Sequence, residues 1–133
     1  MTPEAYARFC HALEEFNAAA FFACHDTLEA LWLADPTPWR RLYQGILQVA
    51  AAFVHWQRQE YAGIVPLLDR GLEALAPFPD RTAGIDLAKL RRDVASLRGR
   101  FHREGPAALQ TVRPEHLPRI EVRSATAAEL PED

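Results

Sequence analysis

The sequence predicts an all-α fold, a compact bundle of about five helices around a buried central helix at about 38–58. Between Arg41 and Arg58 the chain has sixteen residues without a formal charge, although 25% of the whole chain is charged. Apolar side chains recur at helical spacing in this run, and a helix that is apolar nearly all round is buried among neighbours. Glutamines and His55 interrupt the run, so it is not expected to span a membrane.

Start signals and apolar periodicity predict four further helices. Thr2 is a cap followed by proline at the first helical position, which starts the first helix. Asp86 is the expected cap of the fifth helix, where Ile85 and Leu90 are placed to form a hydrophobic staple. The signals of this last helix fade beyond Gly99. The four outer helices are expected at about 3–17, 20–34, 61–75 and 86–99.

The chain length of 133 residues fits one domain with a core of its own. We assign 1–100 to the helical bundle and 101–133 to a C-terminal extension packed on it. Glycine and proline residues make an irregular strap of 101–123, and a disordered tail is expected at 124–133. The start of the chain lacks a basic region followed by an apolar run, so we expect no signal peptide and a cytoplasmic location.

Charge is unevenly distributed along the chain, although the net charge is only −3. Residues 1–39 hold six acids against one base, and residues 89–103 hold six bases against one acid. Two such faces attract each other within one molecule or across a homodimer. The alternative is an anionic ligand or an RNA strand on the basic stretch. Nucleic acid is not the expected partner, because aromatic side chains are nearly absent there.

Cys10 and Cys24 are too few and too far apart for a zinc motif or a redox pair. Both lie on apolar helix stripes, so we interpret them as small buried hydrophobic residues in a reducing compartment. A disulfide between them is the alternative.

Two polar stripes mark the candidate site. His25 and Glu29 are four residues apart and therefore project from one face of the second helix. On the central helix, spacings of three, four and seven place four polar residues in one stripe: Arg41, Gln44, Gln48 and His55. A short loop favours an antiparallel pair of helices, so the two stripes are expected to face each other.

Two imidazoles and a carboxylate, from His25, His55 and Glu29, form the ligand set of many catalytic zinc or iron sites. Such a divalent metal ion lowers the pKa of a bound water, which is the basis of metal-dependent hydrolysis. Glu29 would be a ligand or general base, while Arg41 and the two glutamines of the stripe would orient substrate or water.

The same residues also fit a non-enzymatic structural or protein-interaction module. A buried Glu29 would then be paired by Arg41 or a protonated histidine, and Gln44 and Gln48 would complete a closed hydrogen-bond network that fixes helix packing. The spacing is not the H-E-x-x-H zinc motif, which needs two histidines on one helix. Neither alternative identifies a reaction.

Three segments, FACHDTLEALW (22–32), RLYQGILQ (41–48) and AAAFVH (50–55), resemble domain-of-unknown-function family 309. The resemblance covers roughly 5–98 and implies a compact all-helical bundle, and some members are labelled predicted metal-dependent hydrolases. The family positions found in this chain are His25, Glu29, Trp32, Arg41, Gln44, Gly45 and His55. Two positions depart from the pattern, since Asp26 and Ala23 stand where the family usually or often has glutamate.

Overall fold

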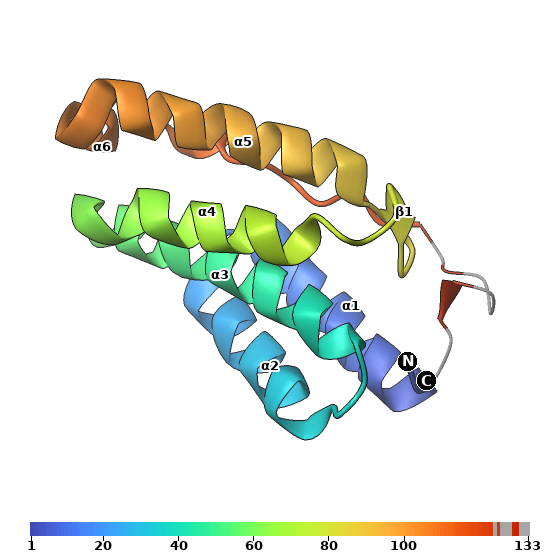
Figure 1. Cartoon of the computed structure of the whole chain (residues 1–133). Coiled ribbons are helices and arrows are strands. Elements are labelled where there is room, and N and C mark those ends of the chain that lie inside the picture. The colour runs from blue at the N-terminus through green and yellow to red at the C-terminus, as the bar shows by residue number, and fades with distance from the viewer. Residues whose placement is uncertain (124, 126–128, 131–133) are drawn as a thin grey trace.

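Figure 1 shows the computed structural model of the chain, which describes residues 1–123, 125, 129 and 130. The longer helices are α1 (Pro3–Asn17), α2 (Phe21–Ala34), α3 (Trp39–Gln57), α4 (Ile64–Leu75) and α5 (Leu87–Glu104). Shorter elements are η1 (Tyr61–Gly63), β1 (Arg81–Thr82), β2 (Ile85–Asp86), η2 (Gly105–Ala107), α6 (Ala108–Thr111) and η3 (Pro114–His116). The predicted all-α fold is therefore confirmed. Within the described ranges, no helix is long and apolar enough to cross a membrane.

Side-chain caps mark the starts of α1 and α5. The Thr2 side chain accepts a hydrogen bond from the backbone N–H of Ala5 at 3.1 Å, and the Asp86 side chain accepts one from Lys89 N–H at 3.0 Å. Each bond satisfies a backbone donor that has no partner within its own helix. Both caps confirm the sequence-based prediction.

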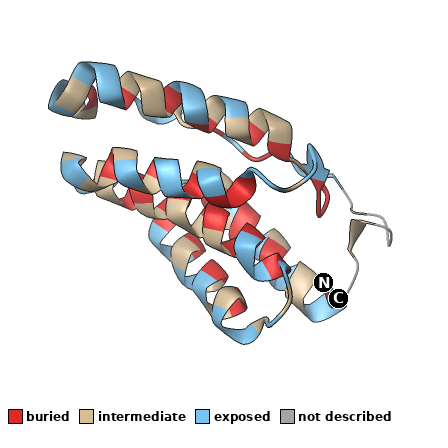
Figure 2. Ribbon diagram, viewed as in Figure 1, coloured by how far each residue is buried: buried red, intermediate tan, exposed pale blue. Residues whose placement is uncertain are grey.

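Helix α3 is the centre of the bundle and lies between α2 and α4 (Figure 1). Figure 2 shows buried positions along α3, and ten of its residues are buried: Trp39, Leu42, Tyr43, Gly45, Ile46, Val49, Ala50, Ala52, Phe53 and Val54. Packing neighbours on most sides explain why the sequence can omit charges from this helix. The prediction of a buried central helix is confirmed.

An aromatic cluster joins the first three helices. The ring centroid of Phe53 on α3 lies 5.1 Å from that of Phe21 on α2 and 6.0 Å from that of Phe16 on α1. Phe16 and Phe21 meet edge to face at 5.4 Å, a favourable geometry for aromatic quadrupoles. This cluster fixes α1 and α2 on the same side of α3.

The thiol of Cys24 is buried in the core, whereas Cys10 is half-buried, and both cysteines are free. Burial, with the charge of Glu15 as a smaller cause, raises the pKa of the Cys24 thiol to about 12. Because the thiolate is the reactive form, we expect iodoacetamide at pH 8 to modify native protein at Cys10 well before Cys24. Peptide mass spectrometry of timed samples measures both rates, with urea-unfolded protein as the control. Equal rates in the native protein would contradict this prediction.

The sequence did not predict the hairpin of β1 and β2. Arg81 pairs with Asp86, and Thr82 pairs with Ile85. The two linking residues have positive φ angles, 50° at Ala83 and 79° at Gly84, as a type I′ turn requires. The strands have only two residues each, and alanine is an unusual residue at the first turn position. The sequence therefore lacks the alternating strand pattern and turn signal that predict a hairpin.

The C-terminal arm (residues 113–123) runs back along α5 toward the hairpin (Figure 1). Val122 forms a bridge with Ile85, and the amide of Asn17 exchanges two hydrogen bonds of 2.9 and 2.8 Å with the backbone of Ile120. Helix α5 itself continues past Gly99 to Glu104, so the helix end expected near Gly99 was too early. The disordered tail expected at 124–133 falls largely outside the described residues.

Candidate functional site

The side of α3 that faces α4 is defined by small residues. A methyl group added at Gly45 would lie 2.6 Å from Leu75 Cδ2, and one added at Gly71 of α4 would lie 2.8 Å from Val49 Cγ2. The backbones of α3 and α4 therefore approach closely along the line of Gly45 and Val49.

The side of α3 that faces α2 is defined by two stacked arginines. The guanidinium carbon of Arg40 lies 5.2 Å from the ring centroid of Trp32, and that of Arg58 lies 5.6 Å from the ring of Phe22. Arg40 Nε also donates a hydrogen bond to the Trp32 carbonyl at 3.1 Å. α2 therefore packs along the side of α3 on which Arg40 and Arg58 lie.

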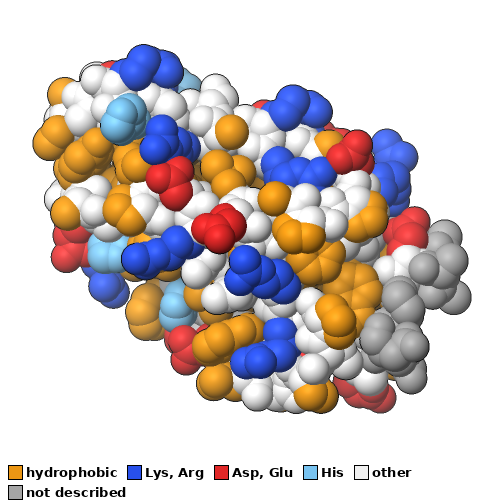
Figure 3. Space-filling model, in the orientation of Figure 1, with side chains coloured by type: hydrophobic (Ala, Val, Ile, Leu, Met, Phe, Trp, Pro, Cys, Tyr) orange, Lys and Arg blue, Asp and Glu red, His pale blue; other side chains and the backbone are white. Residues whose placement is uncertain are grey.

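Gln44 and Gln48 lie between these two contact lines. With 3.6 residues per turn, both side chains project from the part of α3 that neither α2 nor α4 covers fully. Both glutamines are half-buried, and Arg41 Nη1 donates a hydrogen bond to Gln44 Oε1 at 3.2 Å. Figure 3 shows the surface of the molecule in the orientation of Figure 1. Basic, acidic, histidine and apolar side chains are mixed on this surface.

His25 and Glu29 lie on the same side of α2 as Phe22 and Trp32, since all four follow spacings of three and four residues. The opposite side of α2 turns toward α1, where the Thr27 hydroxyl donates to Glu15 at 2.6 Å. Arg40 of α3 stacks on Trp32, and Arg58 directly after α3 stacks on Phe22, so the stripe between those two rings borders α3. We call His25, Glu29, Gln44 and Gln48 the polar strip.

The imidazole of His25 is held between two acids and an aromatic ring. Nε2 lies 3.9 Å from Glu29 Oε2, Nδ1 lies 3.5 Å from Asp26 Oδ1, and the ring stacks on Phe22 with centroids 6.4 Å apart. The side chain of His25 is 27% exposed and that of Glu29 is 48% exposed. The expectation of a buried Glu29 is therefore wrong, because its stripe lies at the rim of the α2–α3 contact.

His55 belongs to a different environment. Its Nδ1 lies 3.2 Å from Glu60 Oε1, its side chain is 38% exposed, and its ring packs on Gly63 of η1. Among the residues that the structure describes, no group of three or more His, Cys, Asp or Glu side chains could hold a metal ion. The predicted ligands His25, Glu29 and His55 are thus not assembled as one centre, and metal binding stays a prediction.

Two atoms of the polar strip are buried and make no hydrogen bond among the described residues, although Asp26 Oδ1 lies 3.5 Å from one of them, His25 Nδ1. The other atom is Gln48 Oε1. Buried polar atoms in native proteins nearly always have a partner, and the exceptions concentrate where a water, ion or ligand binds. The closed network expected from the sequence is therefore open at these two atoms.

Two further buried polar atoms, the Tyr43 hydroxyl and Trp56 Nε1, meet no hydrogen-bond criterion within the residues that the structure describes. Burial, and to a smaller extent the nearby Asp35 carboxylate, raise the pKa of the Tyr43 phenol. Sequence reasoning also missed Arg40, Arg58 and Glu60 around the candidate site. Their signal was their position, since these charges lie within a few residues of the two ends of the uncharged run of α3.

Comparison with known proteins supports the resemblance found in the sequence. Residues 9–67 match the model of a family described as "Domain of unknown function (DUF309)". A relative, "Uncharacterized protein YpuF" of Bacillus subtilis (strain 168), is 38% identical over 77 residues. This alignment covers 56% of the present chain and 42% of the relative, so the chain spans less than half of that protein. The family match includes α2 and α3, and therefore the whole polar strip.

Proposed function

We propose that the polar strip is a binding site for a small polar molecule, with His25 as the group that exchanges a proton with it. The observation that carries this proposal is that two buried atoms, His25 Nδ1 and Gln48 Oε1, make no hydrogen bond with the described part of the chain. An unsatisfied buried polar atom costs about 1–3 kcal/mol of stability, and a bound ligand that supplies the missing hydrogen bond would remove this cost. The match of residues 9–67 to a family places the strip in the part of the chain shared with relatives.

Each residue of the polar strip has a role that follows from its chemistry. Gln48 Oε1 is only an acceptor, so it selects a ligand group that donates, such as a hydroxyl, amine or amide. A neutral imidazole offers one donor and one acceptor nitrogen, which makes His25 the proton-exchanging group. Glu29 lies 3.9 Å from His25 Nε2, a distance that shortens to a hydrogen bond when a catalytic group engages its ligand. Gln44 holds Arg41 at the end of the strip, where it can orient an anionic group.

Some members of the family that the sequence resembles are labelled predicted metal-dependent hydrolases, but the donor set of this chain does not fit a preformed metal centre. His55 is turned to Glu60 and Gly63, and the remaining pair His25–Glu29 supplies too few ligands for a catalytic site of the usual three. Hydrolysis within the proposal therefore rests on general base catalysis by His25, positioned by Glu29.

The replacement Gln48→Met tests whether the strip is kept for binding. Methionine has a similar length and removes the unpaired acceptor, so the free energy of unfolding should rise by about 0.5–2 kcal/mol. Urea denaturation followed by circular dichroism measures this change. A loss of more than about 1 kcal/mol would show that Gln48 belongs to a stabilising network and would favour the structural alternative.

Binding is tested by NMR titration of the protein with amino acids, sugars and small amides, and with zinc ions as a separate arm. We expect shifts of polar-strip resonances that disappear in His25→Asn. His11→Asn is the matched control, because His11 lies 3.7 Å from Glu15 in the same i, i+4 arrangement on α1. Stoichiometric zinc binding lost in both His25→Asn and His55→Asn would instead support the metal centre, and shifts unaffected by His25→Asn would contradict the proposed site.

A further inference from the structure

A cavity of about 460 Å³ lies between one face of α5 and the C-terminal arm. This volume falls within the range of about 300–1,000 Å³ that is typical of small-molecule sites. The α5 positions recur at spacings of three and four residues and therefore share one helix face. The polar residues that line the cavity and carry the argument are Lys89, Arg100, Arg103, Glu115, His116 and Arg119.

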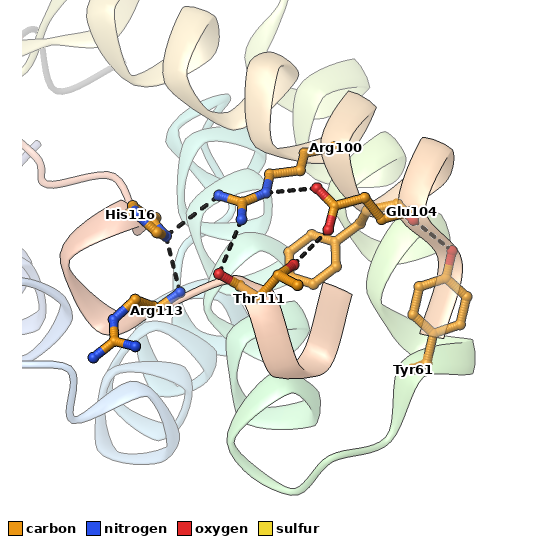
Figure 4. Close-up of polar contacts among 7 residues, drawn as sticks. Tyr61, Arg100, Glu104, Thr111, Arg113 and His116 are labelled. Carbon is orange, nitrogen blue, oxygen red and sulfur yellow. Dashed lines mark hydrogen bonds and ion pairs between the residues drawn. The ribbon is translucent and has the colours of Figure 1, made fainter. Parts of the chain in front are cut away.

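Arg100 lines this cavity and links α5 to the segment that follows it (Figure 4). Its guanidinium donates to Glu104 Oε2 at 2.8 Å and to the Thr111 carbonyl at 2.9 Å. The other oxygen of Glu104 accepts a hydrogen bond from the Thr111 hydroxyl. These bonds, from Thr111 first and Arg100 second, lower the pKa of Glu104. Arg100 is therefore held in one orientation. Its remaining guanidinium nitrogen, Nη1, lies 3.3 Å from Nδ1 of His116.

The tautomer of His116 follows from its neighbours. Nδ1 accepts the backbone N–H of Arg113 at 2.9 Å and faces the Arg100 guanidinium, which can only donate. A nitrogen that accepts from two donors carries no proton, so the proton of the neutral ring is on Nε2. No partner for Nε2 is found among the described residues. The cavity wall therefore contains a neutral hydrogen-bond donor with a fixed orientation.

The charges around the cavity leave an excess of positive charge. Its two carboxylates are paired, Asp93 with Lys89 at 2.9 Å and Glu115 with Arg113 at 3.0 Å. Arg103 and Arg119 have no carboxylate partner in the part of the chain that the structure describes, and Arg119 donates only to the Asn17 carbonyl at 3.0 Å. Guanidinium groups match the planar geometry of oxyanions and bind them by charge-assisted hydrogen bonds.

We propose that the cavity between α5 and the C-terminal arm binds a small, multiply charged oxyanion, held by Arg103, Arg119 and the Nε2–H of His116. A nucleic-acid strand fits less well, because Asp93 and Glu115 border the path of an extended polyanion and no Phe, Tyr or Trp lines the cavity. None of these residues belongs to the polar strip, so this proposal does not depend on the proposed function of the polar strip.

Isothermal titration of the full chain with inorganic pyrophosphate and, separately, with citrate tests the proposal. We expect saturable one-to-one binding of at least one anion, weakened by added sodium chloride because the arginines are exposed. Binding of pyrophosphate alone assigns the ligand to the phosphates, and binding of citrate alone to the carboxylates. Absence of saturable binding of both at low salt, or binding of a single-stranded RNA without binding of either anion, would overturn the proposal.

Arginine variants locate the site. Arg103→Gln and Arg119→Gln should each weaken binding about tenfold, the loss expected for one charge-assisted hydrogen bond. Arg92→Gln is the matched control, because Arg92 is exposed on α5 but does not line the cavity. Equal weakening by Arg92→Gln and Arg103→Gln would show only general charge attraction and would overturn the assignment.

His116→Asn separates binding from the integrity of the arm. The asparagine oxygen can replace Nδ1 as acceptor for Arg113 N–H and Arg100, while the Nε2–H donor is lost. We expect binding to weaken severalfold with the thermal unfolding midpoint unchanged. Unchanged affinity in this variant would show that His116 does not contact the anion and would contradict its place in the proposed site.

Discussion

Replacing Phe53 by alanine is expected to lower the free energy of unfolding by about 3–5 kcal/mol. The Phe53 side chain is fully buried in α3 and touches the aromatic rings of Phe16 and Phe21. Its removal deletes a large apolar surface and leaves a cavity where three helices meet, which rigid neighbours cannot fill completely.

Urea denaturation followed by far-ultraviolet circular dichroism measures the effect of Phe53→Ala. Phe22→Ala is the matched control, because Phe22 directly follows Phe21 on α2 but is 55% exposed. We expect the control to cost less than about 1 kcal/mol, as is usual for surface sites. Similar losses in the two variants would mean that the aromatic cluster does not organise the core.

Replacing Gly45 by alanine is expected to cost about 1–2 kcal/mol, although alanine is the better helix former. The added methyl would lie 2.7 Å from Leu75 Cγ and 3.3 Å from Ala74 Cβ, both buried on α4. Forcing the helices apart costs about 1–3 kcal/mol, which exceeds the gain of about 0.5–1 kcal/mol in helix propensity. The family resemblance includes Gly45, and this contact gives it a packing role rather than a binding role.

Gly99→Ala provides the comparison within one protein. Gly99 lies in α5, and a methyl there would meet only Arg103 Nη1, the mobile end of an exposed side chain, at 3.1 Å. This variant should therefore gain about 0.5–1 kcal/mol from helix propensity. Thermal and urea unfolding of the two variants, measured together, should give opposite signs. Stabilisation by both would show that the α3–α4 contact tolerates the methyl group.

Helix positions were predictable because caps and apolar periodicity are local signals. Thr2 and Asp86 mark helix starts in the sequence, and the uncharged run marks α3 as the buried element. The same periodicity placed His25 and Glu29 on one stripe that borders α3. The hairpin at 81–86 escaped notice because its four strand residues and its Ala83–Gly84 turn carry too weak a pattern.

The interaction partners of the polar residues were harder to predict than the helix face on which each residue lies. Helical spacing gives the direction of a side chain but neither the crossing of two helices nor the path of the chain beyond a helix end. His55 pairs with Glu60, which follows the end of α3, and Glu29 lies at an exposed rim. His25, Glu29 and His55 therefore lie on the two expected helices, but their side chains do not surround a common metal position in the described structure.

The two hydrogen bonds between Asn17 and Ile120 close a loop of more than a hundred residues. Contacts this distant in sequence form only after the intervening chain is ordered, so we expect the C-terminal arm to dock last during folding. The same segment can then open in the native state while the helices stay assembled. The C-terminal arm forms one wall of the cavity against α5, so its opening would give a ligand a path into and out of that cavity.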